Sequence, residues 1–129
     1  MLVFVLIFAA VLCVARSEEG VPFTGMYSDP NHPDCYRKIV DNQDKLSVYG
    51  QDNKGGEGVS CMTNDKAQLD NWGPCPAAAN ATSITVDLSS KGGPSDLSGT
   101  WDAKSSRIVW ADGNYWQHTP EKRANVKDE

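Results

Sequence analysis

After its first 17 residues the chain has no long hydrophobic run, and no window places apolar residues at the spacing of an amphipathic helix. It also lacks a cluster of basic side chains. Its 12 lysines and arginines are scattered and outnumbered by 17 acidic residues, which gives a formal net charge of −5. Recognition of nucleic acid needs lysine and arginine gathered against phosphate. We therefore expect no nucleic-acid partner, no long surface helix and no membrane span in the mature chain.

Metal-binding and catalytic motifs are missing as well. No two cysteines have the close spacing of a zinc knuckle, and the two histidines lie far apart in the sequence. The loop QDNKGGEG, residues 51–58, matches neither an EF-hand loop nor a phosphate-binding loop. His32, Asp34 and Cys35 stand together, but no nucleophile motif surrounds them. The sequence predicts no metal, no cofactor and no catalytic residue, so we expect a protein that is not an enzyme.

The one long apolar segment lies at the N-terminus. Residues 2–14 form an unbroken run of 13 apolar residues, the length of the hydrophobic region of a signal peptide and too short to cross a bilayer. Small residues follow at the spacing of a cleavage site before Glu18. We predict a cleaved signal peptide over residues 1–17 and a secreted, extracellular protein. The remaining length fits one domain, residues 18–119, followed by a charged, disordered tail, residues 120–129.

Three cysteines remain after cleavage, namely Cys35, Cys61 and Cys75. An odd number allows one intramolecular disulfide and leaves one thiol, which is either buried or joined to a second chain as a homodimer. The short segment between Cys61 and Cys75 makes this pair our first choice, and a bond from Cys35 to either partner stays open. The tripeptide Asn80-Ala81-Thr82 is an N-glycosylation sequon in a secretory context, so we predict a glycan on Asn80.

Turn-forming residues recur about every ten residues, and the segments between them are short and rich in β-branched and aromatic residues. We expect strands near residues 26–27, at 35–42, 45–52, 59–63 and 83–89, and in a Trp-rich meander at 99–118. Residues 66–69 suit a helical turn, and Pro74 and Pro76 argue against regular structure around them. The pattern predicts an all-β domain: a small antiparallel sandwich or partly open barrel of about six to eight short strands.

The meander carries a hairpin signal, Asp112-Gly113, between two apolar runs. A two-residue loop at this position would pair Trp110 with Tyr115. The register then distributes aromatic residues over both faces, with Ile108, Trp110 and Tyr115 on one and Val109 and Trp116 on the other. A sheet with one solvated face alternates apolar and polar residues. Two aromatic faces therefore indicate either a hairpin buried on both sides or an exposed aromatic face that binds something.

We expect most of these rings to be core, with the wetter face as the candidate binding surface. Aromatic rings stack on the apolar faces of sugars, and Asp and Asn bond to sugar hydroxyls. The candidate ligand-binding residues are Trp101, Trp110, Asp112, Asn114, Tyr115 and Trp116. We predict a secreted binding module that takes a glycan or an extracellular protein, with carbohydrate as the first ligand class. The alternative is a structural or protein-interaction component of a matrix, a coat or a secreted effector, joined as a disulfide-linked dimer.

Overall fold

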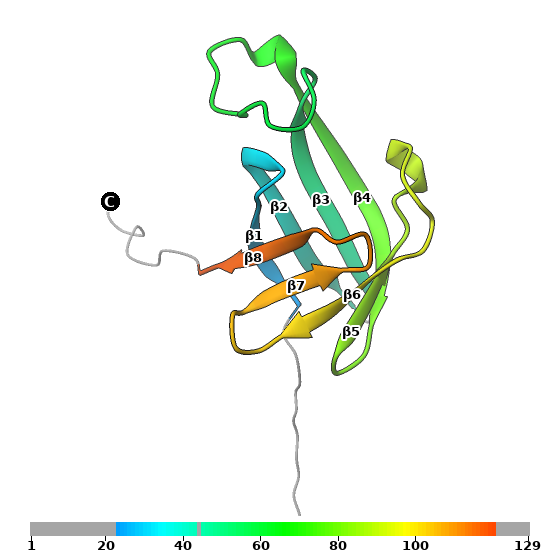
Figure 1. Cartoon of the computed structure of the whole chain (residues 1–129). Helices are drawn as coiled ribbons and strands as arrows, with labels where there is room; N and C mark the ends of the chain where they lie inside the picture. Colours follow the sequence, from blue (N-terminus) through cyan, green and yellow to red (C-terminus); the bar gives the residue numbers. More distant parts are fainter. Residues whose placement is uncertain (1–22, 44, 121–129) are drawn as a thin grey trace, which may run out of the picture.

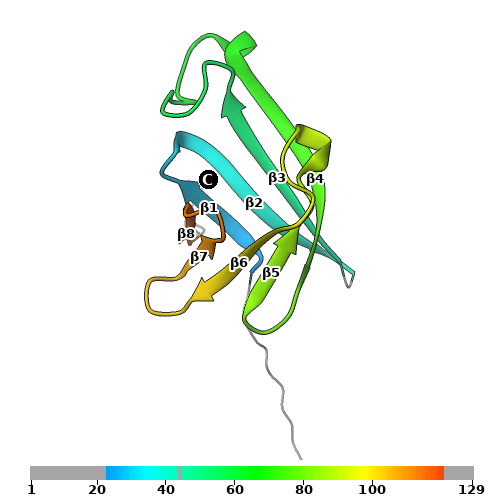
Figure 2. The ribbon, with the colours of Figure 1, turned by 45° about the vertical axis from the view of Figure 1, so that its right-hand side comes forward.

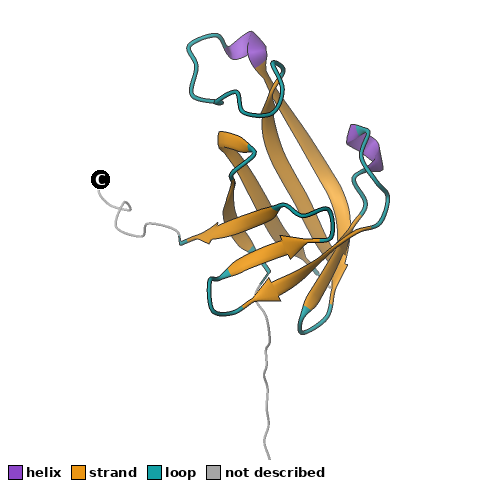
Figure 3. Ribbon diagram, in the orientation of Figure 1, coloured by secondary structure: helices purple, strands orange, loops and turns teal. Residues whose placement is uncertain are grey.

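The structure is a computed structural model that describes residues 23–43 and 45–120. The predicted signal peptide and the predicted tail beyond Pro120 lie outside these residues. Eight strands follow one another along the chain (Figures 1 and 3). Their bounds are β1 Gly25–Asp29, β2 His32–Asn42, β3 Lys45–Asn53, β4 Leu69–Ala79, β5 Ser83–Val86, β6 Leu97–Asp102, β7 Arg107–Trp110 and β8 Tyr115–Thr119. Two short 3-10 helices, Lys66–Gln68 and Ser89–Lys91, lie before β4 and after β5.

Each strand pairs antiparallel with the next, and β8 pairs with β1, so the sheet closes into a barrel. The turned view in Figure 2 shows the strands around a common interior. The prediction of a small all-β domain is confirmed, and of the two architectures the protein adopts the barrel. The barrel is closed because β1 and β8, the first and last strands in the sequence, pair over Met26–Ser28 and Gln117–Thr119. Closure removes sheet edges that would otherwise be open to pairing with another chain.

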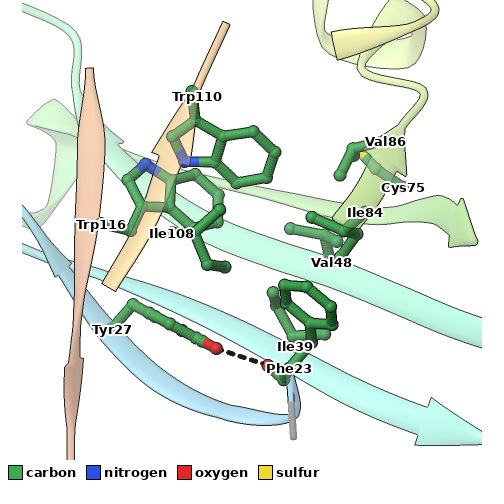
Figure 4. Close-up of a cluster of buried hydrophobic side chains, with 10 residues drawn as sticks. All are labelled: Phe23, Tyr27, Ile39, Val48, Cys75, Ile84, Val86, Ile108, Trp110 and Trp116. Carbon is green, nitrogen blue, oxygen red and sulfur yellow. Dashed lines mark hydrogen bonds between the residues drawn. The ribbon is translucent and has the colours of Figure 1, made fainter. Parts of the chain in front are cut away.

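The core fills the interior with side chains from nearly every strand (Figure 4). Alternate residues point inward, as the period of two along a strand requires. The buried cluster consists of Phe23, Tyr27, Ile39, Val48, Cys75, Ile84, Val86, Ile108, Trp110 and Trp116. The expectation that most of the aromatic rings are core is therefore correct for Trp110 and Trp116, which are 3% and 5% exposed.

Strand β4 runs through the segment in which the sequence predicts no regular structure. Only Ala77, Ala78 and Ala79 of β4 pair with β5, so the stretch that holds both prolines pairs with β3 alone. The carbonyl of Pro76 accepts a hydrogen bond from Asp87 N at 2.9 Å, on the side away from β3. The N–H that proline lacks would point to the same side as this carbonyl, so its absence costs no hydrogen bond to β3. Strands tolerate proline at such edge positions.

The register of the β7–β8 hairpin also differs from the prediction. Ile108 pairs with Trp116, and Val109 pairs with Tyr115. The loop has three residues, ending in Gly113 at φ +97°, and Trp110 N–H donates to the carbonyl of Asn114 at 2.8 Å. A turn followed by a glycine in the left-handed region is the usual three-residue hairpin connection. The one-residue shift moves Trp110 and Trp116 to the same, inner face, and it places Tyr115 on the outer face with Val109, which is 43% exposed.

The disulfide joins Cys35 to Cys61, not Cys61 to Cys75 as our first choice had it. The segment around Cys61, predicted as a strand over 59–63, is instead part of the loop between β3 and β4. This loop folds back over the β1–β2 end, where Cys61 N–H donates to the carbonyl of Pro33 at 3.0 Å. Proximity along the sequence misled the prediction because Cys75 points into the barrel beside Val48, out of reach of the loop.

Cys75 has a free thiol with 0% exposure. A bond from this thiol to a second chain would require the barrel to open. Asn80 lies in the exposed turn between β4 and β5, at the end of the barrel opposite the β3–β4 loop (Figure 1). Among the described residues no helix has the length and apolar character needed to cross a membrane.

Candidate ligand-binding site

A cavity of about 650 Å³ opens at the end of the barrel that carries the β1–β2 turn. The β1–β2 turn, the β7–β8 hairpin and the segment between β5 and β6 form its wall, and the β3–β4 loop reaches it through Glu57. Its volume lies within the range of about 300–1,000 Å³ of small-molecule sites, which commonly occupy the mouths of β-barrels. The cavity is the candidate site because aromatic rings and charged side chains converge in it.

Trp72 enters the cavity wall because β4 contains a bulge. Val48 pairs with Cys75 and Gly50 pairs with Trp72, so β4 has one residue more than β3 over this interval. Without the extra residue, the alternation that points Cys75 inward would point Trp72 outward. The bulge therefore gives β4 two inward side chains three residues apart, one in the core and one in the cavity.

Two glycines make room for the indole rings. A side chain at Gly50 would overlap the ring of Trp72, and a Cβ at Gly99 would lie 2.7 Å from Cε3 of Trp110. Both glycines occupy inward positions of strands, where any larger residue would displace the ring that covers it. Trp110 in turn packs edge to face on Trp116, with ring centroids 4.9 Å apart. The aromatic wall is thus held in place by close packing on the backbone.

Arg37 forms the floor of the cavity and is 2% exposed. Its Nε and Nη2 donate to Asp29 Oδ2 at 3.2 and 2.9 Å, and Nη2 also donates to Asp52 Oδ1 at 3.0 Å. Its Nη1 donates to the carbonyls of Tyr36 at 3.1 Å and Gln51 at 2.7 Å. The guanidinium has five N–H groups, so all its donors are in use. Arg37 therefore organises the site and has no donor left for a ligand.

Asp29 is the acceptor at the centre of the network. Its Oδ1 accepts from the backbone N–H of Asn31 at 2.9 Å and from Nδ2 of Asn114 at 3.1 Å. Its Oδ2 accepts from Arg37 and from Nδ1 of His32, the latter at 3.1 Å. Asn114 thereby ties the β7–β8 hairpin to the β1–β2 turn, across the two ends of the sequence. Burial opposes ionisation of Asp29, but the bonds from Asn114 and Asn31 and the charge of Arg37 outweigh it and lower its pKa.

Asp52 joins the floor to Lys91, which comes from the segment after β5. Lys91 Nζ donates to Asp52 Oδ2 at 3.0 Å and lies 4.2 Å from the centroid of the Trp72 ring. Burial again opposes ionisation of Asp52, but the hydrogen bond from Lys91 and the charge of Arg37 prevail, so the pKa of Asp52 is also lowered. The indole N–H of Trp72 helps to lower this pKa without reaching hydrogen-bonding geometry. Two carboxylates and two cations therefore balance at the base of the site.

His32 stands at the side of the cavity and is oriented by Asp29. Its Nδ1 lies 3.1 Å from Asp29 Oδ2, and the ionised carboxylate can only accept the Nδ1 proton. The Nε2 atom lies 4.0 Å from Asp52 Oδ1, beyond hydrogen-bonding distance. His32 therefore presents its Nε2 atom to the cavity, fixed in orientation by the buried carboxylate.

The structure brings together five of the six predicted ligand-binding residues. Those that line the cavity are Trp110, Asp112, Asn114, Tyr115 and Trp116. Trp101 does not line it. Its ring packs edge to face on Phe23 and His118 at the other end of the barrel, with centroids 5.9 and 6.3 Å apart.

Sequence reasoning missed the remaining half of the site: Asp29, His32, Arg37, Trp72 and Lys91. One signal was readable. Arg37 lies between Cys35 and Ile39 at the spacing of two that defines one strand face, so a cation stands on an otherwise apolar face. Trp72 gave no such signal, because its direction depends on the bulge.

Within the ranges 23–43 and 45–120, no three His, Cys, Asp or Glu side chains gather closely enough to hold a metal ion. The fold and the site define a class of protein: a small closed β-barrel with an aromatic and charged cavity at one end. No protein-family model matches the chain, and neither a curated protein nor a solved structure matches it.

Proposed function

We propose that the protein is a secreted binding module that holds a carbohydrate in the cavity at the end of its barrel. The observation that carries the proposal is the composition of this cavity, in which Trp72, Trp110 and Trp116 stand beside Asp112 and Asn114. Indole faces suit the apolar faces of a sugar ring, and carboxylate and amide groups suit its hydroxyls. Arg37 and Asp29 hold the wall rigid, which limits the entropy that binding must overcome.

Secretion is supported by two features that are independent of the cavity. The apolar N-terminal run has the length of a signal peptide. The disulfide between Cys35 and Cys61 suits an oxidising compartment. Because this bond anchors the loop that carries Glu57 to the cavity, its formation in that compartment would also complete the site.

The test is a glycan-array screen of the purified mature domain, residues 18–129, followed by tryptophan fluorescence on any glycan that binds. A bound sugar is expected to quench and shift the emission because three indoles line the cavity. Asp112→Asn is the first variant to compare. It keeps the oxygen that accepts from Asn114 N–H at 3.0 Å and removes the charge at the rim. Unchanged affinity in Asp112→Asn together with unchanged fluorescence on binding would place the glycan elsewhere and contradict the proposal.

The second candidate, a protein-interaction component, is favoured by the exposed apolar side chains of the β3–β4 loop. Met62 is 78% exposed, and Val59, three residues earlier in the same loop, is 40% exposed. Apolar groups gathered on a loop often mark a contact surface for another protein. A non-reducing gel and light scattering distinguish the two candidates. A covalent dimer would favour the interaction role, and a monomer that binds glycans would favour the module.

A further inference from the structure

The hydrogen bonds inside the cavity leave only some of its polar groups available for a ligand. Arg37 has no spare donor, and each carboxylate oxygen of Asp29 accepts at least two hydrogen bonds. These buried groups form a closed network inside the protein. The groups that recognise a ligand must therefore be those whose bonding capacity the network leaves unused.

The indole N–H groups of Trp72 and Trp110 and the ammonium of Lys91 meet this condition. The Nε1 atoms of both indoles are buried and have no hydrogen-bond partner, although both side chains line the cavity. A buried donor without a partner is costly, so an acceptor atom brought by a ligand would be stabilised there. Lys91 has spare donors as well. Its ammonium has three N–H groups and uses one on Asp52.

Charge decides what kind of acceptor fits beside Lys91. Asp29 and Asp52 are compensated by Arg37 and Lys91, so the base of the site carries no excess negative charge that would repel an anion. The rim residues Asp112 and Glu57 are exposed, as is Lys91, so solvent and salt screen the rim charges, whereas the Lys91 ammonium is held in place by Asp52. An anionic oxygen next to Lys91 gains a charge-assisted hydrogen bond, about twice as strong as a neutral one.

We propose that the cavity selects acidic sugars, in which Lys91 receives the carboxylate and the Trp110 N–H donates to another oxygen of the same ring. A carboxylate supplies acceptors only, which matches the spare N–H groups of Lys91. The sugar hydroxyls then meet the Nε2 atom of His32 and the amide oxygen of Asn114. The inference rests on the proposed function, since it names the class of carbohydrate that the same cavity takes.

The experiment measures binding of matched sugars that differ only at C6: glucose and glucuronate, galactose and galacturonate, mannose and mannuronate. Binding is followed by tryptophan fluorescence and by calorimetry on the mature domain at neutral pH. We expect at least one uronate to bind about tenfold more tightly than its neutral partner. Lys91→Met should remove this preference, and Trp110→Phe, which keeps a ring but removes the N–H, should weaken both members of the pair.

Two control variants are matched to these changes. Lys38 also lies over an aromatic ring, 6.0 Å from the centroid of Tyr49, but it is exposed and away from the cavity. Lys38→Met should therefore leave the preference for uronate intact. Trp101→Phe repeats the ring change at the opposite end of the barrel and should leave both affinities intact. Circular dichroism of every variant establishes that the barrel is folded.

The outcomes separate the two proposals. A preference for uronate that Lys91→Met removes supports the inference. Neutral sugars that bind as tightly as the uronates overturn it while leaving the carbohydrate-binding function in place. If none of the six sugars binds, the acidic-sugar inference falls, and the array screen then decides whether the broader function falls with it.

Discussion

The two ends of the barrel use aromatic rings differently. At the end that holds Phe23, the rings meet edge to face, and at the end that holds the cavity, the rings surround charged groups. In the first, His118 packs on Tyr27 with centroids 5.2 Å apart, and the Tyr27 hydroxyl donates to the carbonyl of Phe23 at 2.7 Å (Figure 4). In the second, the guanidinium of Arg37 lies between Trp72 and Trp116, at 5.3 and 5.6 Å from their ring centroids. The rings pack against one another at one end and line a cavity at the other.

The difference shows that the same residue types serve two tasks in one small domain. Burial at the packed end raises the pKa of the Tyr27 hydroxyl. The open end keeps a cavity because its interior side chains bond to one another and leave a space that no apolar residue fills. Packing at the first end stabilises the fold, and the polar network at the second keeps a binding site in shape.

The largest expected effect comes from removing the cation at the floor of the cavity. Arg37→Met leaves the buried Asp29 without its charge partner, which typically costs about 3–5 kcal/mol of unfolding free energy. Urea denaturation followed by tryptophan fluorescence measures the loss. The neighbouring exposed Lys38→Met should change the stability by no more than about 0.5 kcal/mol. Equal losses in the two variants would show that the network does not stabilise the barrel.

The disulfide ranks second, because it attaches the β3–β4 loop to the open end of the barrel. The double change Cys35→Ser with Cys61→Ser should cost about 2–4 kcal/mol. It should also loosen the loop enough for trypsin to cleave after Lys54, whose side chain is already exposed. Cys75→Ala is the control, since Cys75 takes part in no disulfide and the loop should stay protected. Protection that survives loss of the disulfide would mean that hydrogen bonds alone hold the loop.

A matched pair of tryptophans tests the two ends directly. Trp101→Phe and Trp116→Phe should each cost about 1–2 kcal/mol of stability, since each shrinks a packed ring. Only Trp116→Phe should also reduce ligand affinity, because Trp116 lines the cavity and Trp101 does not. Equilibrium unfolding and fluorescence titration supply the two numbers. An affinity loss in Trp101→Phe of the same size would remove the functional distinction between the ends.

The smallest expected effect tests the register of the β7–β8 hairpin. Val109 points outward, so Val109→Thr should change the unfolding free energy by no more than about 0.5 kcal/mol. A loss above about 2 kcal/mol would instead support the register with a two-residue loop, in which Val109 shares the face of Trp116. Thermal unfolding of the variant beside the parent chain is sufficient to decide.

The sequence allowed a correct prediction of the all-β class and of most strands, and five of its candidate residues lie on the hairpin that lines the cavity. Those features are local, since turn residues and alternation can be read within ten residues. The incorrect parts each depend on how segments pair or pack in space. The hairpin register was wrong because Asp112-Gly113 is compatible with loops of two and of three residues. The predicted disulfide was wrong because the two bonded cysteines are brought together by a loop that folds back. Pro76 argued against a strand, but β4 tolerates it because it lies beyond the end of β5, where no neighbouring strand needs its N–H.

By itself, the sequence determined that this chain forms antiparallel strands, several of them joined by tight turns, because those preferences belong to neighbouring residues. Only the tertiary structure decided that Trp72 points inward, that Trp110 and Trp116 share a face, and that Arg37 meets Asp29. Each of these depends on the register of a partner strand, and a shift of one residue reverses every side chain on a strand. The cavity therefore exists only once the barrel has closed, because its wall comes from both ends of the sequence.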